Sequence, residues 1–197
     1  MTKKNLLGNE IFTLDNILSP QECAEYITLT ENIGYTDAPI NTIRGFERRP
    51  DIRNNQRVIL DDQERAFDLW QRIMSNLIPN TIGQWQALGL NERFRFYRYD
   101  PGQRFALHHD GSYQRPNGEE SLLTFMIYLN EGFDGGETRF HLPRRYYEHL
   151  LTIAVVPVTG MSLCFVHELV HEGTPVIQGR KYVLRSDVMY RRMSEVY

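Results

Sequence analysis

The sequence predicts a mainly β protein of the α+β class, in which two helices precede an eight-stranded jelly roll. Apolar and polar residues alternate from Arg93 to Tyr99, and an apolar run covers Ser121–Asn130. Short strand-like runs then recur as far as Tyr190, separated by turns that contain glycine or proline. Strands of this length at this spacing are typical of a β-sandwich or barrel.

The composition suits one soluble domain over residues 1–197. A hydrophobic share of 41% and a charged share of 24% favour an ordinary globular core. The net charge of −3 provides no field that would attract nucleic acid or a membrane surface. Cys23 and Cys164 lie in apolar runs, which indicates reduced core residues and no disulfide. The N-terminus has no apolar segment of the signal-peptide kind, so we expect a cytoplasmic enzyme.

Residues 1–90 are expected to form a helical support for the jelly-roll core of residues 91–190. The run Ser-Pro-Gln-Glu at 19–22 predicts a helix start, because Ser19 can cap and Glu22 can complete a capping box. Gly34 ends this helix. A second helix opens at Asp61–Glu64 and is stopped by Pro79. The apolar stripes expected to pack on the outside of the sheet are Cys23, Ile27, Thr30 and Ile33, then Ala66, Leu69, Trp70, Ile73, Met74 and Leu77.

The remaining pattern predicts the strands and one long loop. The loop 35–56 has no clear period, and its part 40–57 is rich in arginine at positions 44, 48, 49, 53 and 57. Such a loop is either a lid that receives an anionic or peptide partner or a solvated surface. The expected strands are Glu10–Asn16, Thr36–Ile40, Val58–Leu60, Arg93–Tyr99, Ser121–Asn130, Gly136–Phe140, Leu151–Val156, Met161–Val166, Val170–Ile177 and Lys181–Tyr190.

A His-x-Asp triplet at 108–110 is the chemical centre of the sequence. In an extended strand the side chains of His108 and Asp110 leave the same face, whereas His109 points away. Two histidines and one carboxylate make the facial triad that holds Fe(II) in non-haem oxygenases and leaves coordination positions open. The second histidine is available at His171, ten residues before Lys181. We therefore expect His108, Asp110 and His171 to be both metal ligands and catalytic residues.

At these positions the sequence resembles the 2-oxoglutarate- and Fe(II)-dependent dioxygenases of the prolyl 4-hydroxylase type. Their motif Tyr-x-x-Gly-Gln-x-Phe-x-x-His-x-Asp is present from Tyr99 to Asp110. Three more of their motifs follow in order, namely Thr-x-x-x-Tyr-Leu-Asn at 124–130, Gly-Gly-Glu-Thr-x-Phe at 135–140 and His-x-x-x-Pro-Val-x-x-Gly-x-Lys at 171–181. The motifs lie within residues 90–190, about half of the chain. The resemblance implies a double-stranded β-helix, the cupin-like jelly roll.

The resemblance also implies the cofactors and the reaction. Fe(II), 2-oxoglutarate and O₂ would be used, with ascorbate as the candidate reductant and with release of succinate and CO₂. Lys181 would bind the far carboxylate of 2-oxoglutarate, Tyr99 would donate a hydrogen bond to it, and Arg180 is the competitor of Lys181. Tyr128 and Thr124 share a strand face, so either could line the cosubstrate pocket or pack in the core. The hydroxylated substrate, a prolyl or other peptidyl residue, a protein or a small molecule, is not readable from the sequence.

Two other functions fit parts of the pattern. A cupin-like metal-binding protein or isomerase would use the same ligands without O₂, but the pair of Lys181 and Tyr99 favours a dicarboxylate cosubstrate. Residues 167–171 also read His-Glu-x-x-His, the zinc-peptidase motif, which works only on a helix. Gly173 and Pro175 follow at once, so a sustained helix is not expected there, and His167 would be incidental.

Gly102 and the pair Gly135–Gly136 are expected where the backbone must adopt a positive φ. Glycine adopts positive φ at no steric cost, so these positions predict tight turns and no ligand role.

Overall fold

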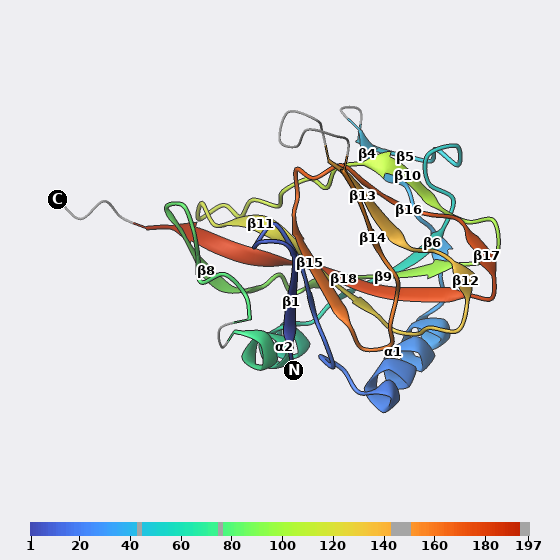
Figure 1. The fold of residues 1–197 in the computed structure, drawn as a ribbon, viewed down its shortest axis with the longest axis horizontal. Helices are drawn as coiled ribbons and strands as arrows, with labels where there is room; N and C mark the ends of the chain where they lie inside the picture. Colours follow the sequence, from blue (N-terminus) through green and yellow to red (C-terminus); the bar gives the residue numbers. More distant parts are fainter. Residues whose placement is uncertain (43–44, 75–76, 143–150, 194–197) are drawn as a thin grey trace.

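Two antiparallel sheets form the body of the molecule. The computed structural model describes residues 1–42, 45–74, 77–142 and 151–193 (Figure 1). The large sheet has the strand order β1-β2-β15-β11-β18-β9-β6-β3, with β8 also paired to β18 and β7 paired to β8. Its strands are β1 (Lys3–Leu7), β2 (Ile11–Leu14), β3 (Thr36–Asp37), β6 (Gln56–Asp61), β7 (Thr81–Ile82), β8 (Trp85–Leu90), β9 (Arg93–Tyr99), β11 (Glu120–Tyr128), β15 (Ser162–Val166) and β18 (Lys181–Arg192).

The small sheet has the order β10-β16-β13-β14 and faces one side of the large sheet. Its strands are β10 (Phe105–His108), β13 (Thr138–Leu142), β14 (Leu151–Val155) and β16 (His171–Gly173). Two short pairs complete the fold, β4 (Ile40–Thr42) with β5 (Gly45–Glu47) and β12 (Asp134–Gly135) with β17 (Val176–Gln178). The mainly β fold class with two helices, a double-stranded β-helix, is confirmed.

The two helices cover the other side of the large sheet (Figure 1). Helix α1 (Pro20–Ile33) begins with the expected capping box, in which the Ser19 hydroxyl accepts from the Glu22 amide at 3.2 Å and the Glu22 carboxylate accepts from the Ser19 amide at 2.8 Å. Helix α2 (Gln63–Ile73) is capped by Asp62, which accepts from the Arg65 amide at 2.9 Å.

The second helix is shorter than expected, because it ends at Ile73 and not near Pro79. Leu77 still packs against the core, although it lies beyond the helix, and Met74 is exposed. The helical spacing of apolar residues continues beyond the end of α2, because a turn can also direct a side chain such as Leu77 to the core. This spacing therefore predicted a helix that was too long. None of the described helices has the length and apolar character needed to cross a membrane.

The chain before residue 91 contributes strands as well as helices. Strand β2 is inserted between β1 and β15, and β6 extends the large sheet beyond β9. Every expected strand region contains a strand, whereas β1, β4, β5, β7, β8 and β12 were not expected. The Trp85–Leu90 segment shows no clear alternation and contains a glycine, which explains why its sequence did not predict β8. A single domain over residues 1–197 stays a prediction.

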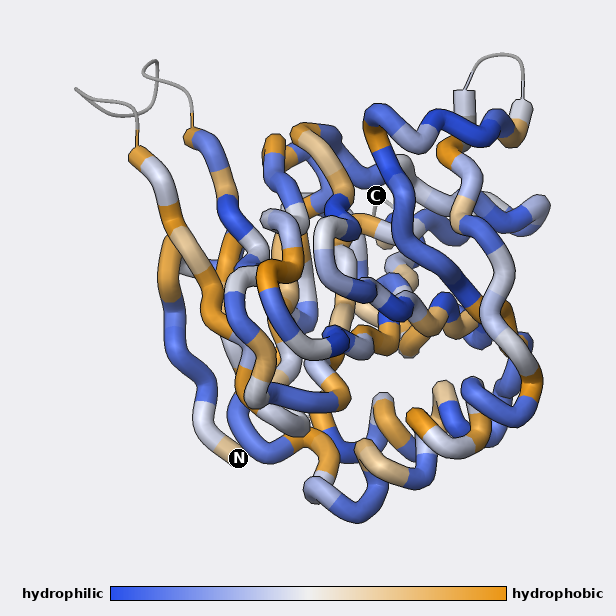
Figure 2. Tube along the Cα trace, turned by 90° about the vertical axis from the view of Figure 1, so that its right-hand side faces the viewer, coloured by the Kyte–Doolittle hydropathy of each residue, from blue (hydrophilic) through white to orange (hydrophobic). Residues whose placement is uncertain are grey.

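Two buried clusters lie on opposite sides of the large sheet. Figure 2 shows that hydrophobic (orange) and hydrophilic (blue) segments occur in both the strands and the helices. The cluster under the helices includes Phe94, Phe96 and Leu184. The cluster between the sheets includes Tyr97, Tyr99 and Val183, which are the neighbours of the first set along the same strands. Successive side chains of a strand point to opposite faces of the sheet. One face therefore packs in the core under the helices, and the other face carries Tyr99 and Lys181 into the space between the sheets.

Gly160 links the N-terminal segment to the large sheet. Its carbonyl accepts from the Ile17 amide at 2.9 Å, and its amide donates to the Tyr128 carbonyl at 2.8 Å. Its φ is +76°, and a Cβ atom there would lie 2.0 Å from the Leu18 carbonyl oxygen. Only glycine fits this position without a shift of the backbone.

We expect Gly160→Ala to lower the free energy of unfolding by at least about 1–3 kcal/mol, the cost of a non-glycine residue at positive φ, with the clash added. Gly89→Ala is the matched control, because a Cβ atom at Gly89 meets nothing within 4 Å. Urea denaturation of both variants measures the difference. Equal stability of Gly160→Ala and the parent would contradict this account.

Candidate metal and cosubstrate site

The pairing of β10 with β16 brings the two expected histidines together. His108 lies directly opposite His171 in this antiparallel pair. Asp110 follows β10, and its amide donates to the His167 carbonyl at 3.0 Å, which links the end of β10 to the turn after β15 of the large sheet. One donor atom from each of His108, Asp110 and His171 lies within 4.8 Å of the other two.

Both imidazoles present the same nitrogen to the site. His108 Nδ1 is 2.7 Å from the Ala106 carbonyl, and His171 Nδ1 is 2.8 Å from the Leu169 carbonyl. Since a carbonyl can only accept, both Nδ1 atoms carry the proton and both Nε2 atoms keep a free lone pair. Burial lowers the pKa of His108 to about 3 and also lowers the pKa of His171, so both rings are neutral, as metal ligands must be.

The Asp110 carboxylate is held by Thr124 and Arg185. Its Oδ2 atom accepts from the Thr124 hydroxyl at 2.7 Å and lies 3.2 Å from Arg185 Nη2. Burial alone would raise its pKa, but the charge of Arg185 and the Thr124 hydrogen bond keep the pKa well below its usual range. The carboxylate is therefore ionised, and Oδ1, 3.8 Å from His108 Nε2, is available to a cation.

A chain of hydrogen bonds through Ser121, His167 and Thr124 holds the Asp110 carboxylate in place. The Tyr113 amide donates to the Ser121 hydroxyl at 2.8 Å, and Ser121 Oγ is 2.9 Å from His167 Nε2. His167 Nδ1 is 2.9 Å from the Thr124 hydroxyl, which itself donates to Asp110. These contacts are consistent with one direction of donation from Tyr113 to Asp110. His167, expected to be incidental, is buried and orients the carboxylate through Thr124.

Lys181 lies at the start of β18 and is 2% exposed. Its ammonium donates to the Gly136 carbonyl at 2.6 Å and lies 5.3 Å and 5.4 Å from the ring centroids of Tyr99 and Tyr128. Burial lowers the pKa of Lys181 to about 7, and the Glu137 carboxylate opposes this shift. An anion bound beside the ammonium would restore its charge.

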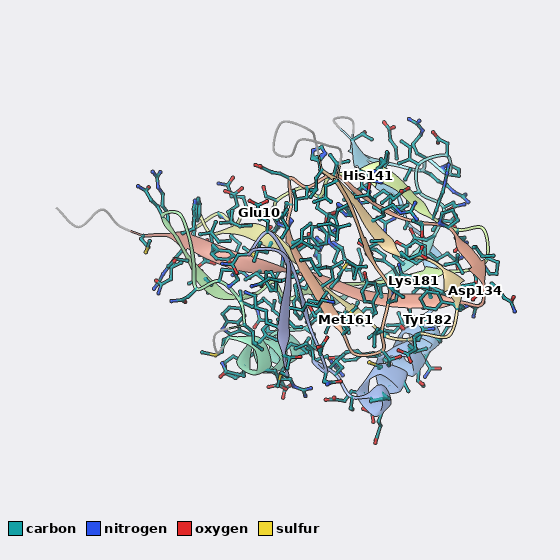
Figure 3. The ribbon with its side chains drawn as sticks, viewed as in Figure 1. Glu10, Asp134, His141, Met161, Lys181 and Tyr182 are labelled. Carbon is teal, nitrogen blue, oxygen red and sulfur yellow. The ribbon has the colours of Figure 1, made fainter. Side chains whose placement is uncertain are left out.

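The neighbours of Lys181 on β18 face the other way. Figure 3 labels Lys181 and Tyr182 on opposite sides of the strand, and the Tyr182 hydroxyl donates to Glu31 of α1 at 2.6 Å. Arg180 donates to Asp100 at 2.5 Å and is exposed. Arg180 therefore points away from the pocket that Lys181 enters.

One pocket connects these groups. Its lining residues are Tyr97, Tyr99, Phe105, His108, Asp110, Thr124, Met126, Thr138, Phe165, His171, Gly173, Lys181, Val183 and Arg185. Tyr128 lies behind this lining and donates to the Thr138 hydroxyl at 2.8 Å. Burial raises the pKa of Tyr99 to about 12, so its hydroxyl stays protonated and can donate.

The turns near Lys181 depend on the expected glycines. Gly102, Gly135 and Gly136 have φ of 82°, 73° and 71°, which confirms the predicted positive φ. A Cβ atom on Gly136 would lie 3.3 Å from Lys181 Cδ and 3.0 Å from the Phe133 ring. The missing side chain lets the lysine reach the Gly136 carbonyl.

The arginines of residues 40–57 have different environments. Arg48 and Arg49 are exposed and pair with Asp37 and Asp51, as a solvated surface would. Arg53 is buried, with its guanidinium carbon 4.3 Å and 4.4 Å from the ring centroids of Tyr97 and Phe105. Arg44 lies outside the described residues. Arg185 lines the pocket, and Arg53 packs on the lining residues Tyr97 and Phe105. No spacing rule links either arginine to the histidines, so the sequence did not predict their places beside the metal cluster.

The His-Glu-x-x-His stretch is not helical. His167 and Glu168 lie in a turn, and His171 begins β16. Glu168 is exposed, as is His109, which points away from the site as strand parity predicted. The helix that a zinc peptidase of this motif requires is absent from these residues.

Comparison with known proteins identifies the family. Residues 94–186 match the family model described as the 2OG-Fe(II) oxygenase superfamily. This segment contains the His-x-Asp triplet, His171 and Lys181. The match supports the 2OG-Fe(II) oxygenase superfamily as the family of this segment, which is just under half of the chain. Prolyl 4-hydroxylase 1 of Arabidopsis thaliana is 26% identical over 135 residues, which cover 67% of this chain and 47% of that protein. The chain thus spans about half the length of this relative.

Solved structures of two prolyl hydroxylases share the fold. A collagen prolyl hydroxylase of Paramecium bursaria Chlorella virus-1, determined as a 2OG complex, has a TM-score of 0.59 and 23% identity and covers 92% of this chain and 97% of its own. A Trichoplax adhaerens prolyl hydroxylase, in complex with a hypoxia inducible factor peptide fragment, has a TM-score of 0.67 and 16% identity with coverage of 91% and 83%. At these identities the likeness concerns the fold. The expected family, fold class and enzyme class are confirmed, and the roles of single residues stay predictions.

The donor set fits an Fe(II) ion, because two neutral imidazoles and one carboxylate leave coordination positions open. We expect His108→Ala, Asp110→Ala and His171→Ala each to weaken Mn(II) or Fe(II) binding by more than the 10–100-fold that loss of an outer hydrogen-bond partner costs. Thr124→Val should cost about 10–100-fold, since it frees Asp110. Anaerobic calorimetry measures the affinities. His109→Ala is the control, and a comparable loss in that variant would contradict the assignment.

Proposed function

We propose that the chain is an Fe(II)- and 2-oxoglutarate-dependent dioxygenase that hydroxylates its substrate and releases succinate and CO₂. The observation that carries this proposal is one pocket that joins a two-histidine, one-carboxylate cluster to a buried, uncompensated lysine. The match to the 2OG-Fe(II) oxygenase superfamily supports the same cofactors. The expected reductant, ascorbate, and the expected cytoplasmic location belong to this proposal.

His108, Asp110 and His171 would hold the iron, which supplies the oxidative chemistry when bound. The chain orients these ligands before any ion arrives, because carbonyls fix both imidazole tautomers and Thr124 and Arg185 fix the carboxylate. Loss of one such outer contact typically lowers metal affinity about 10–100-fold. The aromatic lining excludes water from the reacting groups.

Lys181 and Tyr99 would bind the far carboxylate of 2-oxoglutarate. The ammonium and the phenol lie side by side in the interior, where a carboxylate would gain two charge-assisted hydrogen bonds. Tyr128 would act from behind, by orienting Thr138. A cupin-like protein without a dicarboxylate cosubstrate gives no reason to bury this lysine, which is costly when unpaired.

For the substrate class we propose a prolyl or other peptidyl residue. The Arabidopsis relative is named a prolyl 4-hydroxylase, and the Trichoplax enzyme is described with a peptide fragment. The proposal is tested by succinate formation from 2-oxoglutarate without substrate, followed by a peptide screen. Turnover should require Fe(II) and should be abolished in His108→Ala, with His109→Ala as control. Turnover that is independent of iron would contradict the proposal.

We expect Lys181→Ala to weaken 2-oxoglutarate binding by about two to four decades, since breaking a buried ion pair costs about 3–5 kcal/mol and about 1.4 kcal/mol corresponds to a tenfold change. Iron affinity should change far less. Titration of 2-oxoglutarate into the Mn(II)-loaded variant measures the loss. Arg180→Ala is the control, because Arg180 pairs with Asp100 outside the pocket. If only Arg180→Ala greatly weakened 2-oxoglutarate binding, then Arg180 and not Lys181 would bind the far carboxylate.

Glu168 should be dispensable, because it is exposed and lies in a turn. We expect Glu168→Gln to keep at least half of the iron-dependent succinate formation. Zinc-dependent peptide cleavage that disappears in this variant would instead support the peptidase alternative.

A further inference from the structure

A second group of cations lines the interior, apart from Lys181. Arg57 lies opposite Tyr97 in the β6–β9 pair, and Arg95 lies opposite Arg185 in the β9–β18 pair. Residues directly opposite in an antiparallel pair share one sheet face. Tyr97 and Arg185 line the pocket. Arg57 on β6 and Arg95 on β9 therefore lie on the same sheet face as the pocket.

Arg53 completes this group from the loop before β6. Its guanidinium lies between the rings of Tyr97 and Phe105, and Phe105 stacks on the His108 ring with 3.5 Å between centroids. The Phe105 ring therefore lies between the Arg53 guanidinium and His108, a candidate metal ligand. Arg53 is 6% exposed; its Nε donates to Asn55 at 2.7 Å, and its Nη2 has no hydrogen-bond partner among the described residues.

The acidic groups near these arginines do not balance them. Asp187 is shared, 3.2 Å from Arg95 and 3.2 Å from Arg185. Asp110 contacts Arg185 but would also serve the metal. No carboxylate of the described chain forms an ion pair with Arg53. A buried cation without a counter-charge is costly unless a ligand supplies one.

The pKa of the Tyr97 hydroxyl reflects the positive charge of these arginines. Burial alone would raise its pKa, but the charges of Arg53, Arg185 and Arg95 outweigh burial and lower the pKa to about 8. The wall of the pocket at Tyr97 is therefore strongly electropositive, as a site for an anion is.

This wall is separate from the cosubstrate anchor. Lys181 and Arg185 lie on the same face of β18, four residues and about 13 Å apart along the strand. Lys181 faces Tyr99 and the Gly136 carbonyl, whereas Arg185 faces Asp110 and Asp187. One small dicarboxylate held at Lys181 leaves Arg53 without an ion-pair partner among the described residues.

We propose that Arg53, together with Arg185 and Tyr97, binds a carboxylate of the substrate, so that the enzyme acts on an organic acid. The proposal rests on the proposed function and adds one requirement to its substrate, a carboxylate close to the carbon that reacts. A guanidinium matches a carboxylate with two parallel hydrogen bonds, which also fixes the orientation of the bound acid. The acid is a free amino acid or a peptide whose own carboxylate lies near the carbon that reacts.

The test compares acids with their amides. Free L-amino acids, including L-proline, are assayed beside their primary amides, and proline-containing peptides with a C-terminal carboxylate beside the same peptides as C-terminal amides. Succinate formation above the rate without substrate is measured, and calorimetry follows binding to the Mn(II)- and 2-oxoglutarate-loaded protein. We expect stimulation and binding from acids only, and the two sets separate a small-molecule source of the carboxylate from a peptide source.

Arg53→Gln should raise the KM and the Kd of a stimulating acid at least tenfold while the Kd of 2-oxoglutarate changes less than twofold. Arg48→Gln, an exposed arginine paired with Asp37, is the matched control and should leave both constants unchanged. Circular dichroism verifies folding, and Arg53→Lys, which keeps the positive charge but loses the paired donors of the guanidinium, replaces Arg53→Gln if that variant unfolds.

Three results would overturn the inference: amides that stimulate as well as acids, no acid that stimulates, or an Arg53→Gln variant that loses 2-oxoglutarate and not the acid. The proposed function fails by a different result, since it requires iron-dependent succinate formation before any acid is added.

Discussion

The antiparallel pairing of β10 with β16 is the contact on which the site depends. It sets His108 opposite His171 and fixes both rings through carbonyls of the same two chain segments. Neither strand is long, so the pair is stable only because the small sheet packs over the large one. The metal cluster is therefore a property of the whole jelly roll, and no local segment could assemble it alone.

Buried charge is the second constraint, and strand β18 distributes it. Lys181, Arg185 and Asp187 alternate with residues that face α1 and the apolar core, so one strand brings three charged groups into the interior. The helices cover the opposite face of the sheet and supply the apolar burial, which leaves the inner face free for polar groups. Charged groups in this interior interact more strongly than at the surface, so each one influences the ionisation of its neighbours.

The sequence was sufficient to predict which candidate ligands lie close together and most of the strand framework, but not the residues that hold those side chains in place. His108, Asp110, His171 and Lys181 follow from strand parity and from the family motifs, and parity also separated Lys181 from Arg180. Arg53, Arg185 and His167 were missed as site residues because their roles arise from contacts between distant segments. The end of α2 and the strand β8 were missed because apolar spacing does not distinguish a helix from a turn, and a glycine-containing run shows no alternation.

The arginine-rich loop shows why composition alone could not decide between lid and solvated surface. Arg48 and Arg49 behave as surface charges, each with an acidic neighbour, whereas Arg53 lies in the interior between two aromatic rings. The difference follows from the bridge that pairs Arg53 with Phe105 at the start of β10. Because β10 also carries His108, the strand that presents a metal ligand fixes the position of this arginine. Recognition of a substrate anion and binding of the metal would then share one structural element, so a substrate held by Arg53 would lie at a defined position relative to the metal.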